Sequence, residues 1–393
     1  MGFSEVPNMK APWGFRNSLW SFFHPRIVDS SIGSEIGRSN ISPDRRFFMK
    51  KSLFYANRGM TRREFVKTTA VGTAGLAFMN WASSEAHANQ KYPYWGKVIV
   101  ARDDSATDGS SINNQALGSL LDEAVNALTE GRGWERIFPN IKAEDKVAIK
   151  INAMSAAAFI THEEVLAAIV NKLISIGLKP ENVVVFDGDA AMSKIYRLKM
   201  PSISTKGVRL LETGVEGGEG FDQKSKTTFL EGTEVRLARI ITEANHLINV
   251  PVLKVHTLSG ITFSLKNHVG SIDNPRVIHK NLMNSGAIRP GGIAAINNLK
   301  AIKEKTRLIV GDSLFGIYQG SHFGRPQFVF NGLIVGTDPV AVDHQARIIL
   351  NEERGKHGVE PLQADHIEEA ARLGVGASSN DVKVTFLHRK KMG

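Results

Sequence analysis

The sequence predicts an α/β fold: a mostly parallel sheet flanked by helices, arranged in one or two lobes. From residue 97 onward, short runs rich in valine and isoleucine alternate with longer segments whose apolar residues recur at helical spacing. This alternation is typical of βαβ units around a parallel sheet. Several of the β-rich runs end directly in Gly, Asp or Asn, which favours loops gathered at the carboxyl edge of that sheet.

Strands are predicted where β-favouring residues stand together between turn residues. They cover residues 97–102, 146–151, 182–186, 246–250, 307–310, 332–335 and 382–387. Pro251 is expected to close the strand at 246–250, because proline has no N–H to donate to a strand ladder.

Helices are predicted from apolar residues at i, i+3 and i+4 together with capping residues. They run from Ser111 or Asn113 to Gly131 and over 161–176, 235–244, 291–300, 340–350 and 364–373. Thr161–Glu164 has the form of a capping box. Residues 201–230 lack a clear period and are interpreted as a surface excursion or a lobe junction. The polar segment 253–290 is interpreted as an ordered loop with short helices.

Residues 60–88 resemble a twin-arginine signal peptide. The pair Arg62–Arg63 precedes a largely apolar stretch, 68–82, and Ala86–Ala88 supplies the small residues of a cleavage site. The apolar stretch is shorter than the roughly 20 residues that span a bilayer. The mature chain, which begins at Asn89, is therefore expected to hold no stable membrane span.

This resemblance implies export by the twin-arginine machinery to the periplasm or the cell exterior. That route carries folded proteins, many of them with a cofactor already bound, which favours a bound cofactor here. An uncleaved signal that anchors the chain is the alternative. Residues 1–59 are interpreted as an N-terminal extension or as a start placed too far upstream, with Met49 and Met60 as candidate starts, and 89–393 as the α/β domain.

The composition excludes several classes of function. The 393 residues contain no cysteine, so disulfides, thiolate catalysis, Cys-ligated zinc and iron–sulfur clusters are excluded. The formal net charge of +10 is dispersed except in the tail His388–Lys391, and more than half of it falls in residues 1–88, so nucleic acid is not an expected partner. The sequence has no G-x-S-x-G elbow, P-loop or H-E-x-x-H motif.

Polar and cationic residues concentrate in Pro251–His279, directly after a predicted strand. Histidine transfers protons or binds metals near neutral pH, and lysine and arginine bind anionic groups. The predicted catalytic residues are His256, Lys266 and His279. The residues predicted to hold a cofactor or substrate are Lys254, Thr262, Asn267 and Arg276. The alternative is a solvated basic loop whose side chains cap short helices.

Asp187-Gly188-Asp189 follows another predicted strand and offers carboxylate oxygens to a hard cation. The predicted metal ligands are therefore Asp187, Asp189, His256 and His279. A turn stabilised by the two aspartates is an equal alternative. The same ambiguity applies to three further aspartates, of which Asp338 is favoured as a helix cap; the other two are Asp312 and Asp343.

Together these motifs resemble the family labelled domain of unknown function 362. They are, in chain order, Ile248–His256, Thr262, Leu265–Gly270, Arg276, His279 and Ile334–Asp343. The resemblance spans residues 97–352. Many relatives carry an added ferredoxin-like cluster segment, whereas this chain has no cysteine to bind a cluster. Electron transfer through such a cluster is therefore not expected.

A more remote similarity is to the lactate racemase family, whose members use a nickel-pincer nucleotide. In that family a histidine precedes the lysine that holds the cofactor by ten positions, and a later histidine binds nickel. His256 and Lys266 have the same spacing here, and His279 follows. The glycines around the family's lysine are missing, since Phe263-Ser264-Leu265 precedes Lys266.

We expect an exported enzyme, racemase- or isomerase-like or redox-active, with a metal ion or a nucleotide-type anionic cofactor. Lys266 would anchor the anionic group, His256 would act as acid or base, and His279 would be a ligand or a second proton carrier. Lys254 and Arg276 would supply positive charge. One rival is an exported protein that binds a metal or an anionic small molecule without chemistry. Another is an accessory protein of an envelope complex.

Overall fold

The computed structural model describes residues 92–153, 158–188, 207–213, 220–229, 232–278 and 290–391. The predictions for the signal peptide and for residues 1–59 lie outside these described residues, as do the predicted site residues Asp189 and His279. No helix within the described ranges is long and apolar enough to cross a bilayer.

Ten strands of the described chain form one sheet. They are β1 (Lys97–Asp103), β2 (Val147–Ile151), β3 (Val183–Asp187), β4 (Arg209–Glu212), β7 (His246–Val250), β8 (Val252–His256), β9 (Gly260–Thr262), β10 (Thr306–Ile317), β11 (Phe328–Gly336) and β12 (Lys383–Arg389). A separate two-stranded ribbon is made by β5 (Thr227–Thr228) and β6 (Glu234–Val235).

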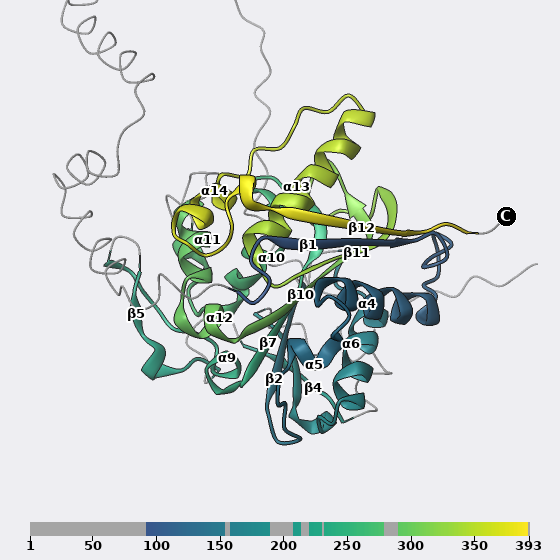
Figure 1. Ribbon diagram of the computed structural model, residues 1–393. Helices are drawn as coiled ribbons and strands as arrows, with labels where there is room; N and C mark the ends of the chain where they lie inside the picture. Colours follow the sequence, from purple (N-terminus) through teal and green to yellow (C-terminus); the bar gives the residue numbers. More distant parts are fainter. Residues whose placement is uncertain are drawn as a thin grey trace, which may run out of the picture. The chain divides into compact units, whose positions relative to one another are not determined.

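The sheet is mixed but mostly parallel. Its order is β12-β1-β11-β10-β7-β2-β3-β4, and β8 pairs with β10 and with β9. The block from β10 to β4 is parallel throughout, as is the β1–β12 pair at the other edge (Figure 1). Only the pairs β1–β11, β10–β11 and β8–β9 are antiparallel among the described residues of this sheet. The predicted α/β fold with a mostly parallel sheet is confirmed.

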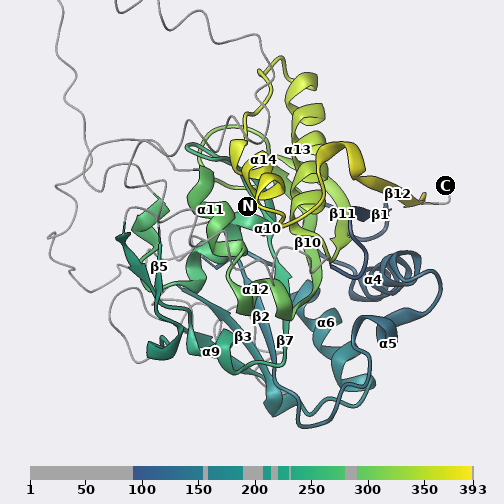
Figure 2. The ribbon, with the colours of Figure 1, turned by 60° about the vertical axis from the view of Figure 1, so that its left-hand side comes forward.

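Helices cover both faces of the sheet (Figures 1 and 2). One layer contains α4 (Asn114–Leu128), α5 (Gly133–Ile137) and α6 (Glu163–Ser175). The other contains α9 (Arg239–Glu243), α10 (Ser264–Asn267), α11 (Pro290–Asn297), α12 (Lys300–Lys305), α13 (Pro339–Lys356) and α14 (Asp365–Arg372). Short 3₁₀ turns lie at Pro180–Asn182, Gln223–Ser225, His268–Ser271, Pro275–Ile278 and Ser379–Asp381.

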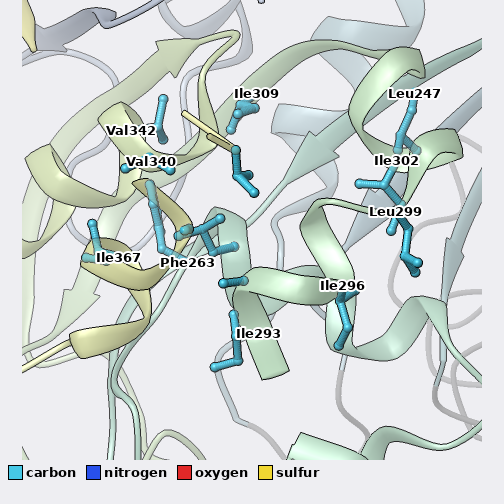
Figure 3. Packing of buried hydrophobic residues seen from close by; sticks show 14 of the residues in the cluster. Leu247, Phe263, Ile293, Ile296, Leu299, Ile302, Ile309, Val340, Val342 and Ile367 are labelled. Atoms are coloured by element: carbon cyan, nitrogen blue, oxygen red, sulfur yellow. The ribbon is translucent and has the colours of Figure 1, made fainter. Parts of the chain in front are cut away.

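Alternation along the strands produces two hydrophobic cores, one on each face. In β3, Val183 and Val185 belong to the core under α4–α6, while Val184 and Phe186 belong to the core under α9–α14. Successive side chains of a strand point to opposite faces, so an uninterrupted apolar run suits a sheet buried on both sides. Figure 3 shows the second core, in which Phe263 packs among side chains from α11, α13 and α14.

Strand β7 ends before Pro251 as predicted, but β8 corrects the prediction that a loop follows. The chain leaves β7 at Pro251 and at once forms β8, because β10 has twelve residues and offers its second half as a new partner. The first half of β10 pairs with β7 and the second half with β8. The segment 253–290, expected to be a loop, therefore begins with a strand and continues into β9 and α10.

Two further local predictions differ from the structure, and one is confirmed. Thr161 does not form a capping box, because its hydroxyl donates to the Val250 carbonyl and accepts from the Asn152 N–H. The helix α6 starts after His162 and has no side-chain cap. The range 201–230 contributes β4, which extends the sheet beside β3.

Asp338 caps α13 as predicted, with its carboxylate accepting from the N–H groups of Val340 and Ala341.

Candidate functional site

A cavity of about 270 Å³ lies at the carboxyl ends of β2 and β3, where β8, β9 and α10 meet them. Loops at this edge of a parallel sheet are the usual place for ligands in α/β proteins. The side chains and backbone that line it come from Lys150, Asn152, Asp187, Gly188, Lys254, His256, Thr262, Lys266, Asn267, Val269, Gly270, Pro275 and His322.

The hairpin β8–β9 places three predicted site residues on one side of the cavity. Lys254 and His256 are two positions apart, so their side chains leave β8 on the same face. Thr262 of β9 stands opposite Lys254 in the antiparallel register. Lys254 Nζ is buried and donates a hydrogen bond of 2.8 Å to the Phe159 carbonyl.

Lys150 and Asp187 form a buried ion pair in the wall of the cavity. Lys150 Nζ lies 2.7 Å from Asp187 Oδ1 and donates a second bond of 2.7 Å to the Ile151 carbonyl. The N–H groups of Ala153 and Gly188 donate to the same carboxylate, each at 2.6 Å. Burial lowers the pKa of Lys150, and the charge of Asp187 opposes that shift. The negative charge of Asp187 is thus balanced within the protein.

Asn267 of α10 connects this ion pair to β7. Its side-chain N–H donates at 2.7 Å to Asn249 Oδ1, and its own oxygen accepts from Lys150 at 3.5 Å and from Asn152 at 3.4 Å. Asn249 in turn donates at 2.9 Å to the Ser264 carbonyl. A buried network in which each member has partners holds side chains in one arrangement, so α10 is fixed against the ends of β2 and β7.

Asp343 of α13 fixes the other end of α10. Its two carboxylate oxygens accept from the N–H groups of Ser264, at 2.7 Å, and Leu265, at 3.1 Å. These are the first two residues of α10, where N–H groups have no partner within the helix. Asp343 is fully buried. This contact sets the position from which Lys266 reaches the cavity.

The cavity is electropositive. Burial and the nearby charge of Lys150 lower the pKa of Lys266 to about 8. Burial also lowers the pKa of Lys254 to about 8, with the charge of Lys266 adding to the shift and that of Asp187 opposing it. Both amines are therefore mainly charged near pH 7. A cleft with one sign of charge raises the local concentration of oppositely charged ligands.

His256 and His322 stack beside these lysines. Their ring centroids lie 4.1 Å apart with an interplanar angle of 21°. His256 Nδ1 accepts hydrogen bonds from the N–H groups of Leu258, at 3.1 Å, and Ser259, at 3.2 Å. Burial and the charges of Lys266 and Lys254 lower the pKa of His322 to about 4, so His322 is neutral near pH 7.

The hydrogen bonds of His256 decide its chemistry. A neutral imidazole has one protonated and one unprotonated nitrogen, and the two backbone donors assign the lone pair to Nδ1. Nε2 therefore carries the proton. His256 in this arrangement is a hydrogen-bond donor at Nε2, whereas the neutral ring of His322 has a nitrogen lone pair that can accept a proton.

The structure brings six of the nine predicted site residues to one cavity and places one, Arg276, outside its lining. Those that line the cavity are Asp187, Lys254, His256, Thr262, Lys266 and Asn267. Arg276 is exposed and is not among the described residues that line the cavity. Asp189 and His279 lie outside the described residues.

The metal prediction gains no support from the part of the chain that the structure describes. No three His, Asp or Glu side chains converge there as a metal would require. Asp187, which was expected to be a ligand, is occupied by Lys150 and by two backbone N–H groups. The ion pair explains the burial of Asp187 without a cation.

Three polar residues that line the cavity were not predicted as site residues: Lys150, Asn152 and His322. Lys150 could have been recognised from the sequence, because it is a lysine inside the apolar strand β2. Burying a charged side chain is costly unless it has a partner. His322 could not have been recognised, since it lies in a turn after β10 that becomes adjacent to β8 only in the folded chain.

Comparison with protein-family models gives one match, over residues 147–347, to the family described as a domain of unknown function (DUF362). The chain belongs to the DUF362 family. The match contains β2, β3, β8, α10 and β10, and with them every residue that lines the cavity. A search of curated proteins found no match to this chain.

Several aspartates in the DUF362 match serve the architecture. Asp338 caps α13 and also accepts from the N–H groups of Gly96 and Ala377. Asp312 accepts from both the N–H and the ring Nδ1 of His162, each at 2.8 Å. With Asp343 at α10, these three side chains join separate segments, and none of them lines the cavity.

Proposed function

We propose that this DUF362 protein is an exported enzyme that binds a small anionic molecule, as substrate or cofactor, in the cavity between β2, β8 and α10. Lys254 and Lys266 attract the anion, His256 donates a hydrogen bond to it, and His322 accepts a proton. The class of reaction is a proton transfer or carbonyl chemistry on an anionic compound.

The charge balance of the cavity carries this proposal. Three lysines line it, and Asp187 is the one carboxylate among the described lining residues. That carboxylate is paired with Lys150, so Lys254 and Lys266 remain without a counterion there. Excess buried charge is unfavourable in a protein, and an anionic ligand supplies the missing negative charge.

The stacked histidines distinguish an enzyme from a simple anion-binding protein. Anion binding needs cations and N–H donors, whereas the unprotonated nitrogen of a neutral histidine is a proton acceptor, which anion binding alone does not require. Burial, together with the lysines that would attract the ligand, lowers the pKa of His322 and keeps its ring neutral. An unprotonated imidazole beside an anion-binding site can accept a proton from a bound ligand.

Calorimetric titration of the full chain with sulfate tests anion binding. Lys254→Met and Lys266→Met should each weaken the affinity by about tenfold or more, the effect of losing a hydrogen bond to a charged group. Lys300→Met, at the exposed first residue of α12, is the matched control and should leave it unchanged. Equal affinities in all four proteins would contradict the proposal.

Native mass spectrometry of the full chain purified from its own host should then identify the anion that the protein retains. Turnover of that compound by the wild type, and its loss in His322→Gln, is the expected result. Saturable binding with no turnover would instead favour the rival function, an exported binding protein.

The proposal of export is supported by the sequence of residues 60–88. Replacing Arg62 and Arg63 together by lysine should leave the protein in the cytoplasmic fraction, while a single replacement of Lys67 by arginine should not. Cell fractionation followed by immunoblotting measures this. An unchanged distribution of the double variant would contradict twin-arginine export.

A further inference from the structure

Lys266 differs from the other two lysines of the cavity in the surroundings of its amine. Lys150 Nζ is held by Asp187 and by the Ile151 carbonyl. Lys254 Nζ donates to the Phe159 carbonyl and lies 5.9 Å from the centre of the Phe159 ring. Lys266 Nζ forms no hydrogen bond or ion pair with any of the described residues, although it lines the same cavity.

An amine in this position is uncharged in a larger fraction of molecules than an ordinary lysine, although it stays mainly charged at pH 7. Burial without a counterion and a neighbouring cation both disfavour an ammonium ion. The pKa of about 8 for Lys266 reflects these two causes. The carbonyl and ring that contact Lys254 both favour its charged form. The pKa of Lys254 is also lowered to about 8, so the contacts distinguish the two amines. Because Lys254 Nζ is held by the Phe159 carbonyl, Lys266 is the lysine whose amine is more available as a nucleophile, in the manner of a desolvated lysine beside a second cation.

We propose that Lys266 Nζ forms an imine with the carbonyl carbon of a small aldehyde or ketone that also carries a carboxylate or phosphate. This inference rests on the proposed function, because the anionic group is held by the charge of Lys254 in the same cavity. It adds the chemical class of the ligand and the covalent step.

The step is balanced without any oxidant or reductant. The neutral amine attacks the carbonyl carbon, a C–N bond forms, and the carbonyl electron pair moves to oxygen, which takes a proton. The nitrogen then loses one proton, which gives a neutral carbinolamine. The hydroxyl takes a second proton, the C–O bond breaks as water leaves, and the iminium nitrogen releases its remaining proton. The sum is an amine and a carbonyl compound giving an imine and one water molecule.

The two histidines match the proton movements of this step. His256 Nε2–H is oriented as a donor by the two backbone N–H groups at Nδ1, and it would stabilise the developing oxyanion. The neutral ring of His322 would accept the proton that leaves the nitrogen, since its pKa of about 4 keeps it unprotonated at neutral pH.

The size of the cavity limits the ligand. Its volume of about 270 Å³ is just below the range of about 300–1,000 Å³ typical of sites for drug-sized ligands. Two backbone segments of its wall pack closely against each other, because a Cβ on Gly188 would lie 2.5 Å from the Gly270 carbonyl oxygen. A compound of a few carbons with one anionic group suits this space.

Reductive trapping of the full chain tests the inference. Glyoxylate supplies an aldehyde with a carboxylate, glycolaldehyde phosphate supplies one with a phosphate, and propionaldehyde is the uncharged control. Cyanoborohydride reduces any imine to a stable amine, and peptide mass spectrometry locates it. The expected result is labelling of Lys266 at least tenfold above exposed Lys300 by one of the two anionic aldehydes, and labelling at background by propionaldehyde. The more reactive anionic aldehyde identifies the anionic group.

Lys266→Arg keeps the positive charge but cannot form the imine, so it should lose the label while its circular dichroism and unfolding midpoint stay close to those of the wild type. Lys300→Arg should lose only its own background label. Labelling of wild-type Lys266 at the level of Lys300, or preferential labelling of Lys254, would overturn the inference. If sulfate still binds in that case, anion binding stands and only the imine fails; if sulfate does not bind either, both fail.

Discussion

The carboxylate of Asp343 accepts a hydrogen bond of 2.7 Å from the backbone N–H of Ser264, 79 positions away in the chain. The same carboxylate accepts from Leu265, so α13 determines where the one-turn helix α10 begins. Helices this short have little stability of their own. The position of Lys266 therefore depends on a residue that does not itself line the cavity.

Replacing Asp343 by alanine should lower the free energy of unfolding by about 2–3 kcal/mol, since two buried N–H groups lose a charged acceptor. Sulfate affinity should fall as well, because α10 is no longer fixed. Urea unfolding followed by circular dichroism, and calorimetric titration, measure the two effects. Asp365→Ala, at an exposed aspartate in the first turn of α14, should change neither by more than about 0.5 kcal/mol.

The ion pair of Lys150 and Asp187 should behave as one unit. Lys150→Met leaves a buried carboxylate without its cation and should cost about 3–5 kcal/mol. The double variant Lys150→Met/Asp187→Leu should be less destabilised than the sum of the two single variants, because neither charge is then left unpaired. Urea unfolding of the four proteins of the cycle decides this, and additive losses would show that the pair is not coupled.

Much of the sheet could be predicted because each strand is an apolar run between turn residues, as in Val183–Phe186. The strand β8 could not be predicted in the same way. Pro251 and the density of polar residues and glycine in 253–290 favour a loop when the sequence is considered alone. The residues of β8 form a strand because the second half of β10 supplies backbone partners, a tertiary effect that overrides local preference.

Stability should depend on pH through His162. Burial disfavours its charged form, but the charge of Asp312 and the 2.8 Å hydrogen bond outweigh this, so the net effect is a raised pKa. A folded-state pKa above the unfolded value of about 6.5 contributes stability that is fully present below about pH 6.5. That contribution is lost as the pH rises through the raised value.

The comparison with His162→Gln isolates this contribution, because other titrating groups are common to both proteins. The difference in unfolding free energy between wild type and variant should be largest at about pH 5–6 and should shrink toward about pH 9. A difference that stays constant over this range would rule out the His162–Asp312 pair as its source.

Sulfate binding should also depend on pH, in the direction set by Lys266. Its lowered pKa of about 8 means that the ammonium is present below that value and is lost above it. Affinity should be nearly constant from about pH 5 to 7 and then fall by up to about tenfold per pH unit for each amine that deprotonates. Sulfate keeps its charge over this range, and constant ionic strength removes the effect of screening.

In Lys266→Arg one of these amines no longer titrates, so the decline above about pH 8 should be shallower than in the wild type. Titration calorimetry of both proteins from about pH 5 to 10 provides the two curves. Superimposable declines would assign the pH dependence to other groups.

Gly270 should tolerate no side chain. A Cβ there would lie 2.6 Å from Asp187 Oδ1, so Gly270→Ala must displace the carboxylate that pairs with Lys150. Overpacking of this kind costs about 1–3 kcal/mol. A Cβ on Gly291 in α11 would meet no described atom within 4 Å, and Gly291→Ala should be neutral or stabilising by up to about 1 kcal/mol. Thermal unfolding of both variants distinguishes these outcomes.

The candidate site was partly predictable because its chemistry is concentrated in one segment. Lys254, His256 and Lys266 stand close together in the sequence, and all three line the cavity. Asp187 could be predicted as a site residue because it is a carboxylate that follows a strand. Its partner Lys150 lies 37 positions earlier, and no spacing rule connects the two residues. His322 comes from beyond α11 and α12, so only the tertiary fold places it against His256.

The first strand of the described chain, β1, pairs on one side with β11 and on the other with β12, in register from Lys97 with Lys383 to Asp103 with Arg389. A ribosome makes β1 long before either neighbour exists. β1 therefore has no partner on either side until β11 and then β12 have been synthesised. A nascent chain that lacks β12 would leave one side of β1 without backbone partners, so this edge of the sheet is completed late in folding.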